Sequence, residues 1–229
     1  MSRIYVPTEG PVDWKRLLAK PELHWKTGHS AKALAYCWEE NNEDFPECVK
    51  RVFKASCIRL FEGAELLLAL PEHEVPLPGG SHPSQNDVFV LAKGEGELIS
   101  ITVEGKVSEA FGPTVEVWNK NGSPGKKQRL VFLLNLLGLK KKDVDGVRYQ
   151  LMHRTASALI EAKKFNARNA LMLVHSFSQT AQSFEDYRRF VELFGLVVGG
   201  VNEIVGPTYL GRIDLYFGWV KGDEEYLLR

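Results

Sequence analysis

One ten-residue run constrains the fold of this chain more than any other feature. Residues 98–107 alternate between two faces, and this period of two is typical of a strand with one buried side. The apolar face consists of Ile99, Ile101, Val103 and Val107, and the polar face of Ser100, Thr102, Glu104 and Lys106. The preceding Lys-Gly-Glu-Gly-Glu at 93–97 predicts a hairpin turn to a second apolar strand at 88–92.

The turn also predicts which residues of the two strands face each other. If the loop comprises the four residues 94–97, Lys93 pairs with Leu98, and counting back places Asp87 directly opposite Glu104. Residues in opposite positions have Cβ atoms about 5 Å apart. Glu104 and Lys106 lie about 6.6 Å apart along the same face. Two carboxylates and a lysine therefore form one patch, which a slip of one residue would disperse.

The rest of the chain combines helical and extended periods. Ser30 can cap a helix whose apolar positions continue to Trp38, and a second helix follows Phe45-Pro46. Further helices are predicted at 12–18, 130–139, 147–165 and 184–194, and strands at 65–70, 115–118, 170–175, 197–205 and 213–220. Residues 72–85 contain prolines and glycines and are predicted as a loop, and 119–125 as a turn.

This order of elements predicts an α/β fold, a mixed sheet with a central antiparallel meander flanked by helices. The 229 residues suit one domain, with a lead-in segment at 1–28, a core at 30–177 and a closing helix and strands at 178–229.

Cysteine usage and hydropathy indicate the compartment. The three cysteines form no Cys-x-x-Cys pair, so a disulfide framework or a zinc ribbon is not expected. No apolar run approaches the roughly 18 residues of a membrane span, and the first residues lack the pattern of a secretory signal. We therefore expect a soluble cytoplasmic protein without a membrane partner.

Charge is balanced overall but unevenly distributed along the chain. Residues 36–119 carry fifteen acidic and six basic side chains, whereas residues 120–168 carry twelve basic and three acidic ones. An acidic part could bind a cation and a basic part could meet phosphate. Alternatively, the two blocks face each other or lie on solvated helix faces.

Several common hydrolytic sites do not match the sequence. The six histidines include no His-x-x-x-His pair, which argues against a zinc hydrolase. No Gly-x-Ser-x-Gly elbow supports a serine hydrolase. The glycine-containing run at 122–127 has the wrong spacing for a phosphate-binding loop.

The strand at 98–107 carries the more specific chemistry. Acid-x-Lys triplets occur at 13–15, 104–106 and 161–163, but only the middle one lies on a convincing strand. Asp87 and Glu104 would repel each other at this distance, and a hard cation would relieve the repulsion. Mg²⁺ prefers oxygen ligands and retains waters, one of which it can acidify. Lys106 would stabilise the attacking water or the developing oxyanion. The alternative is a solvated hairpin face with a weak Glu104–Lys106 pair.

The arrangement resembles the PD-(D/E)XK nuclease superfamily, which has the restriction-endonuclease-like fold. The resemblance rests on Asn86-Asp87 at the start of one strand and Glu104-Gly105-Lys106 at the end of the next, within residues 30–177. The sequence departs from the family's pattern at Asn86, where the family has proline. The resemblance implies a core of helix, three-stranded meander, helix and strand.

The resemblance also implies roles for individual residues. Asp87 and Glu104 would bind the metal, Lys106 would be the catalytic lysine, and the Gly105 carbonyl could complete the metal shell. Glu39 or Glu40 matches a further acidic ligand of many members, although both could simply belong to an acidic helix end. Substrate contacts would come from the helix after the motif, through Gln150, His153 and Arg154.

The functional expectation is a Mg²⁺- or Mn²⁺-dependent phosphodiester hydrolase. Nucleic acid is the expected partner, DNA rather than RNA, although no residue pattern discriminates the two. The basic region would contact its phosphates through Lys126, Lys127, Arg129, Arg148 and Arg154. Homodimers are compatible with the resemblance, since many members pair to cut two strands. The alternatives are a catalytically inactive binding or assembly module of the same fold, and an enzyme acting on another phosphate ester.

Overall fold

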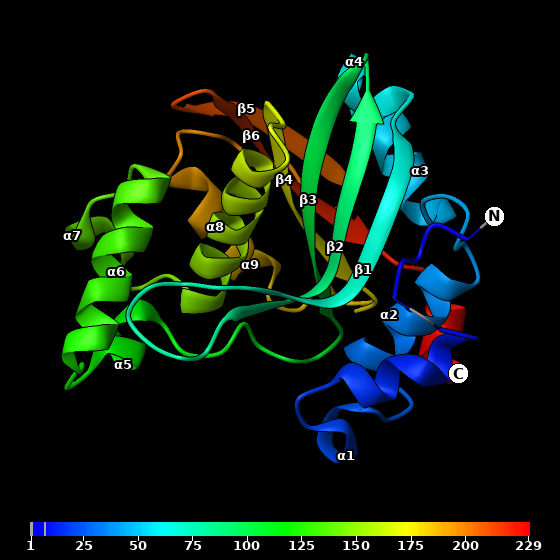
Figure 1. Cartoon of the computed structure of the whole chain (residues 1–229), viewed down its shortest axis with the longest axis horizontal. Helices are drawn as coiled ribbons and strands as arrows, with labels where there is room; N and C mark the ends of the chain where they lie inside the picture. The colour runs from blue at the N-terminus through cyan, green and yellow to red at the C-terminus, as the bar shows by residue number, and fades with distance from the viewer. Residues whose placement is uncertain (1, 7) are drawn as a thin grey trace.

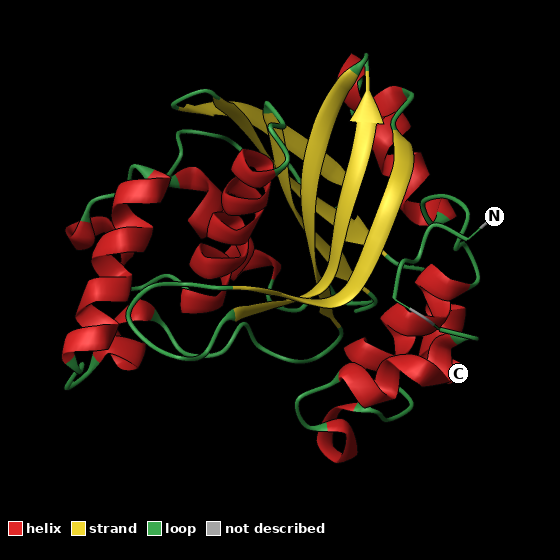
Figure 2. Cartoon of the chain, in the orientation of Figure 1, coloured by secondary structure: helices red, strands yellow, loops and turns green. Residues whose placement is uncertain are grey.

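A mixed sheet with helices on both faces forms the centre of the protein. The computed structural model describes residues 2–6 and 8–229. These residues form a six-stranded sheet in the order β1-β2-β3-β4-β6-β5 (Figures 1 and 2). Strands β1, β2 and β3 form the antiparallel meander, β4 and β6 run parallel to β3, and β5 is antiparallel to β6. The predicted α/β class is confirmed, but the meander occupies one half of the sheet rather than its centre.

The strands are β1 (Glu65–Val75), β2 (Ser84–Gly94), β3 (Glu97–Lys106), β4 (Asn169–Ser176), β5 (Glu203–Leu210) and β6 (Ile213–Lys221). The α-helices are α1 (Pro21–His24), α2 (Ser30–Glu39), α3 (Glu47–Ala55), α4 (Arg59–Glu62), α5 (Val115–Asn119), α6 (Pro124–Leu137), α7 (Lys141–Val144), α8 (Tyr149–Lys164) and α9 (Phe184–Glu192). Two 3₁₀ helices are η1 (Pro11–Leu17) and η2 (Glu224–Leu228). Within the described ranges, none of these helices has the length and apolar character needed to cross a membrane.

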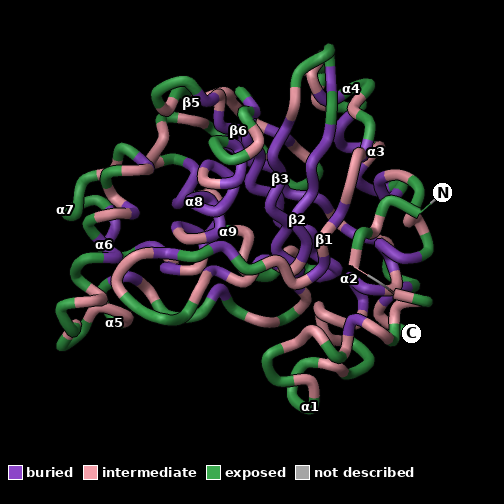
Figure 3. The backbone as a smooth tube through the Cα atoms, viewed as in Figure 1, coloured by how far each residue is buried: buried purple, intermediate pink, exposed green. Residues whose placement is uncertain are grey.

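The two faces of the sheet bury separate apolar cores. Helices α2, α3 and α4 pack on one face, whereas α5 to α9 lie on the other (Figures 1 and 3). Alternation along β3 follows the sequence pattern, because Ile99, Ile101 and Val103 lie in the core beneath α2–α4. On the opposite face, Ser100 Oγ donates to the Ala158 carbonyl of α8 over 2.8 Å. The sequence-predicted division of β3 into two faces is therefore confirmed.

The hairpin register agrees with the prediction. Lys93 pairs with Leu98, and the pairing continues to Val88 and Val103, one residue short of Asp87 and Glu104. The loop is tighter than predicted, because residues 94 and 97 also pair and only two residues turn the chain. Both turn residues have left-handed backbones, with φ values of 50° at Glu95 and 82° at Gly96. This conformation matches the twist of two-residue hairpins.

The predicted strand at 115–118 is wrong, because this segment is the helix α5. Thr114 caps it by accepting a hydrogen bond from the Val117 N–H through its side chain. The N–H groups of Val115 and Glu116 bond to carbonyls at 147 and 145, just before α8. A short run of β-branched residues is compatible with either structure, and the capping threonine decides for the helix here.

Other element boundaries also differ from the sequence pattern. Strand β1 continues through Pro71 to Val75, so the loop after it is shorter than 72–85; proline is tolerated because β1 is an edge strand of this sheet. Helix α6 begins at Pro124, inside the predicted turn. The strand predicted at 197–205 begins only at Glu203, whose carboxylate accepts from the N–H groups of residues 199 and 200 and holds a turn there.

Candidate functional site

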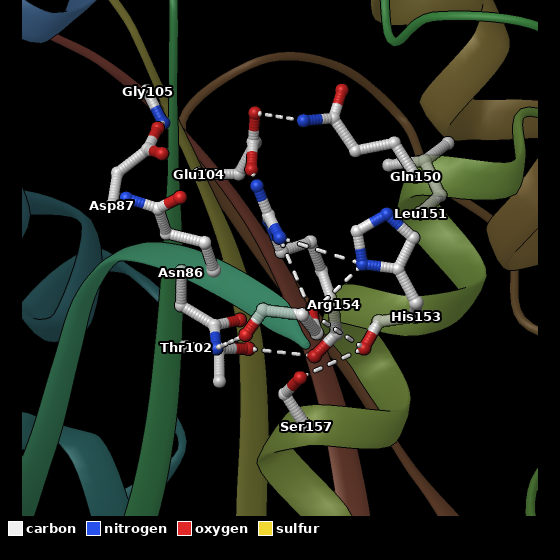
Figure 4. A network of polar contacts seen from close by, with 12 residues as sticks. Asn86, Asp87, Thr102, Glu104, Gly105, Gln150, Leu151, His153, Arg154 and Ser157 are labelled. Carbon is white, nitrogen blue, oxygen red and sulfur yellow. Dashed lines mark hydrogen bonds and ion pairs between the residues drawn. The ribbon is translucent and has the colours of Figure 1, made fainter. Parts of the chain in front are cut away.

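The predicted catalytic residues meet in a cavity between the meander and helix α8. The cavity has a volume of about 550 Å³ and opens at the end of β3. Asp87 reaches it from β2 and Glu104 from β3, and the α8 side chains lie across from them (Figure 4). Lys106 of β3 also lines the cavity. The start of α2 and the loop after β3 complete its wall, through Ser30, Ala31 and residues 109–113.

Helix α8 is held against β3 by hydroxyl groups on the polar face of the strand. Thr102 Oγ1 donates to the carbonyl of Arg154 over 3.1 Å, one helical turn from the bond that Ser100 makes to Ala158. Thr102 and Glu104 share this face of β3, so the same register that joins strand and helix aims Glu104 at the first turns of α8. The hydrogen bonds of Ser100 and Thr102 to α8 therefore set the position of the Glu104 carboxylate relative to Gln150 and Arg154.

Glu104 is the most completely paired of the acidic groups. Its Oε1 atom accepts from Lys106 Nζ at 2.6 Å and from Gln150 Nε2 at 2.7 Å, while Oε2 accepts from Arg154 Nε. Burial opposes ionisation, but the charges of Arg154 and Lys106 outweigh it and hold the pKa of Glu104 below its usual value. Glu104 is therefore an ionised carboxylate in a buried network.

Asp87 has a contrasting environment. Its Oδ2 atom accepts a 2.7 Å hydrogen bond from the Gly105 N–H. Burial and then the nearby charge of Glu104 raise the pKa of Asp87 to about 7, against the opposing effects of Arg154 and Lys106. Ahead of it, Asn86 stands where the resembled family has proline, and its Nδ2 donates to the carbonyls of residues 73 and 84. Asn86 thus ties β1 to β2 directly before the aspartate.

Lys106 and Arg154 supply the positive charge of the site. Besides Glu104, Lys106 Nζ contacts Gln150 Oε1 at 3.3 Å and lies 5.0 Å from the centre of the Phe111 ring. Arg154 NH1 also donates to Ser84 Oγ at 3.2 Å. Burial lowers the pKa of Arg154, but the carboxylates around it reverse this effect and raise it. Both bases are buried.

His153 is a neutral wall residue of the cavity. Its Nδ1 atom lies 2.8 Å from Ser84 Oγ, and its ring packs 4.9 Å from the ring of Tyr149. Burial, together with the charge of Arg154, holds its pKa well below the usual value. His153 can therefore donate or accept a hydrogen bond with a bound group while its imidazole stays neutral.

Two acidic residues of the site escaped the sequence analysis. Glu72 on β1 lines the cavity with a left-handed backbone at φ 52°, and its carboxylate accepts from Gln85 Nε2 at 2.8 Å. Burial and the charge of Asp87 raise its pKa well above the usual value. Only the pairing of β1 with β2 brings it here, and the sequence pattern assigned this residue to a loop.

Glu109 is the second missed residue. It accepts from the N–H of Val107 at 2.7 Å, and from the N–H and Oγ of Ser30 at 3.0 and 2.9 Å. The predicted cap at Ser30 is therefore wrong in detail, since His29 is the capping position and the Ser30 hydroxyl bonds Glu109. Burial acts against these bonds, but they hold the pKa of Glu109 below its usual value. Glu109 anchors the start of α2 to the end of β3.

Glu39, predicted as a further metal ligand, does not join this group. It lies at the far end of α2, about 13 Å along the helix axis from Ser30. Its Oε1 accepts from the indole N–H of Trp14 at 2.7 Å, a buried structural contact. The alternative, Glu40, forms an ion pair with Arg229. Helix α2 presents its first turn to the cavity, so residues in its last turn are directed elsewhere.

The predicted phosphate-contacting residues do not form one patch, and of them Lys126 and Arg129 line a neighbouring hollow. Lys126 lines it, donates to the Trp118 carbonyl and lies 5.3 Å from the Trp118 ring centre. Lys127 is exposed on α6. Arg129 is buried and donates to backbone carbonyls at 77, 78 and 80, and Arg148 pairs with Asp186. Part of the positive charge of the basic region, that of Arg129 and Arg148, is thus already bound to groups of the protein itself.

Comparison of the sequence with protein-family models identifies the family of this chain. Residues 7–224 match the family model described as Domain of unknown function (DUF6946). The chain belongs to this family. The matched range of the DUF6946 domain contains all strands of the described sheet and the whole carboxylate site. No curated protein and no solved structure matches the chain.

The site of this DUF6946 domain contains more acid than base. Glu72, Asp87 and Glu104 face Lys106 and Arg154, and burial together with the neighbouring carboxylates raises the pKa values of Glu72 and Asp87. An added hard cation would relieve this excess of acid, and the oxygen donors suit Mg²⁺ or Mn²⁺. The three carboxylates are not packed as a preformed cluster: among the described residues, one group of three possible ligands lies within 4.8 Å, and it consists of Cys37, Cys48 and His175. The carboxylate residues fit a cation with few protein ligands and several waters.

Proposed function

We propose that this protein hydrolyses phosphodiester bonds of nucleic acid with a divalent cation, Mg²⁺ or Mn²⁺, at the cavity between β2, β3 and α8. The observation that carries the proposal is the convergence of Asp87, Glu104 and Lys106 from two neighbouring strands in one cavity. The sequence of α2, the β1–β3 meander, α8 and β4 supports the resemblance to the PD-(D/E)XK nucleases.

Each residue has a distinct role in this proposal. Asp87 and Glu104 provide carboxylate oxygens to the cation, with the Gly105 carbonyl as a third donor between them. The bound cation would acidify a water and neutralise charge on the phosphodiester. Lys106, which bonds Glu104 in this structure, would direct its ammonium group to the attacking water or the developing oxyanion.

The substrate would lie along the α8 side of the cavity. Gln150, His153 and Arg154 line that wall and offer an amide, a neutral imidazole and a guanidinium to phosphate or sugar oxygens. Lys126 and the exposed Lys127 flank the same side and would attract the backbone. DNA is the proposed polymer, and pairing of two chains to cut both strands is a further prediction of the resemblance.

Hydrolysis is tested on the purified full-length chain with labelled single- and double-stranded DNA and RNA. Product should form only with Mg²⁺ or Mn²⁺ and should fall at least about a hundredfold in Lys106→Ala, as expected for loss of a charge that stabilises a transition state. Lys163→Ala is the matched control, because Lys163 ends another acid-x-Lys triplet and is exposed on α8. Equal rates in Lys106→Ala and wild type would refute the assignment.

One observation favours a second function, a catalytically inactive module that binds nucleic acid. Both oxygens of Glu104 are already occupied by Lys106, Gln150 and Arg154, so this carboxylate is neutralised without a cation. Calorimetric titration with Mn²⁺ separates the two functions. The hydrolase requires binding in wild type that is lost in Asp87→Asn, whereas the module requires DNA binding that is independent of Mn²⁺ and unchanged in Lys106→Ala.

A further inference from the structure

A second group of reactive side chains lies on the face of the sheet opposite the carboxylate site. Cys37 on α2, Cys48 on α3 and His175 on β4 have ligand atoms within 4.8 Å of one another, and all three are buried. The Sγ atom of Cys48 lies 3.3 Å from Nε2 of His175. His175 pairs in register with Gly105 of β3, so this group is directly behind the candidate active site.

Trp38 determines which nitrogen of His175 carries the proton. The indole N–H of Trp38 donates to Nδ1 of His175 over 3.3 Å. An indole nitrogen can only donate, so Nδ1 must be unprotonated and Nε2 carries the hydrogen. Phe177 stacks on the imidazole with ring centres 4.6 Å apart and holds its orientation. His175 therefore donates its Nε2 hydrogen to the sulfur of Cys48.

The same proton arrangement disfavours a metal ion at this group. A metal-binding histidine offers one ring nitrogen to the metal and donates the hydrogen of the other to an acceptor. Here Nε2 faces Cys48 with its hydrogen, and Nδ1 meets a donor in Trp38. A metal on Nε2 would leave the imidazole without either hydrogen. The group fits a hydrogen-bonded thiol pair better than a zinc site.

The two thiols are unequal. A hydrogen bond from Cys37, followed by the hydrogen bond of His175, lowers the pKa of Cys48 despite burial. The same Cys37–Cys48 hydrogen bond, with burial, raises the pKa of Cys37. Asp223 opposes the ionisation of both cysteines, but it is paired with Arg51 at 2.7 Å. Cys48 is the nucleophilic sulfur, and Cys37 retains its proton.

Cys48 is also the cysteine of the pair that a small solute can reach. It lines a cavity of about 220 Å³ between α3 and the end of β6. The basic side chains of Arg51 and Lys221 line the same cavity. This space admits a molecule of the size of hydrogen peroxide, and the positive charge of Lys221 favours a thiolate.

We propose that Cys37 and Cys48 form a redox-reactive thiol pair, in which a hydroperoxide oxidises Cys48 and Cys37 converts the product to an intramolecular disulfide. In the first step the Cys48 thiolate attacks one peroxide oxygen; an S–O bond forms, the O–O bond breaks, and hydroxide leaves and takes up a proton as water. In the second step the Cys37 sulfur attacks Cys48, the S–O bond breaks, and the hydroxyl leaves as water with the Cys37 proton. Two thiols and one hydrogen peroxide thus give one disulfide and two waters.

Peptide mass spectrometry of the native full-length chain tests this proposal. Trypsin releases both cysteines on the single peptide 33–50, so their disulfide appears as the loss of two hydrogen atoms, and Cys57 lies on the separate peptide 55–59. After treatment with one equivalent of hydrogen peroxide, we expect the 33–50 disulfide to form about tenfold faster than oxidation of the exposed Cys57. A thiol reductant should reverse it.

A single variant distinguishes the two steps. In Cys37→Ser the disulfide cannot form, and Cys48 should accumulate as a sulfenic acid that a 1,3-diketone probe labels on the same peptide. Oxidation of Cys57 ahead of the 33–50 peptide in wild type would overturn the proposal. So would the presence of one zinc ion per purified chain, released when the thiols are blocked, because this result would make the group a metal site.

Discussion

The carboxylate of Asp87 on β2 accepts a 2.7 Å hydrogen bond from the backbone N–H of Gly105 on β3. The residue that donates lies between Glu104 and Lys106, so one contact ties the aspartate to the triplet. The absence of a side chain at Gly105 permits it: a Cβ there would lie 3.2 Å from Asp87 Oδ2 and 3.3 Å from Leu34 Cδ2. Asp87 is thus held by a backbone contact, whereas Glu104 and Lys106 are held together by their opposite charges.

Gly105→Ala should therefore disturb the site and the fold together. The added methyl group must displace Asp87 or Leu34, and we expect a loss of about 1–3 kcal/mol in the free energy of unfolding. Urea denaturation measures this change. Gly146→Ala is the control, because a Cβ at residue 146 has no heavy atom within 4 Å and should leave the stability nearly unchanged. Equal effects of the two substitutions would contradict the packing described for Gly105.

Arg154→Met should destabilise the protein strongly, since it removes a buried partner of Glu104. Without Arg154, the buried negative charge of Glu104 is only partly compensated by Lys106 and Gln150. We therefore expect a loss of about 3 kcal/mol in unfolding free energy. Arg188→Met is the matched control, because Arg188 forms exposed ion pairs on α9 and should produce no resolvable change. Adding Glu104→Gln to Arg154→Met should restore part of the stability, and further loss in the double variant would argue against the pairing.

Neutralising Glu72 should cost much less stability than neutralising Glu104. Burial and the charge of Asp87 raise the pKa of Glu72 well above its usual value, so Glu72→Gln removes a charge that the site disfavours and should change the unfolding free energy by less than about 0.5 kcal/mol. Glu104→Gln leaves buried bases without their anion and should cost about 3 kcal/mol. Thermal denaturation of both variants at neutral pH compares them; a larger cost for Glu72→Gln would reverse the assignment of charge in the site.

His153 should oppose folding in mild acid. Its folded-state pKa is well below the 6.5 of an ordinary histidine, so below pH 6.5 the unfolded chain binds a proton that the folded chain does not. The contribution of His153 to stability should therefore fall as the pH decreases from about 6.5, by up to about 1.4 kcal/mol per pH unit, whereas the raised pKa values of Asp87 and Glu72 act in the opposite direction. Relative to wild type, His153→Gln should gain stability as the pH is lowered, and His82→Gln, which alters an exposed loop residue, should follow the wild-type curve. Urea denaturation at a series of pH values measures all three.

Local patterns predicted the half of the site that lies on one hairpin. The two-residue period of 98–107 assigned Glu104 and Lys106 to one face, and the turn at 93–97 placed Lys93 opposite Leu98, as the structure confirms. These relationships depend on neighbours within about twenty residues, and strand pleat and turn length determine them without reference to the rest of the chain. The same local reasoning failed at 115–118, where a cap and contacts to residues 145 and 147 decided for a helix.

What the sequence by itself determined is therefore the β2–β3 register, the two faces of β3 and the α/β class. Only the tertiary structure decided which distant groups join them: Arg154 and Gln150 pair with Glu104, Glu72 enters the site from β1, and Glu39 is directed away to Trp14. It also decided the assembly of Cys37, Cys48 and His175. The physical reason is that these contacts join elements far apart in the chain, and their geometry is set by how both faces of the sheet are packed, which no local period encodes.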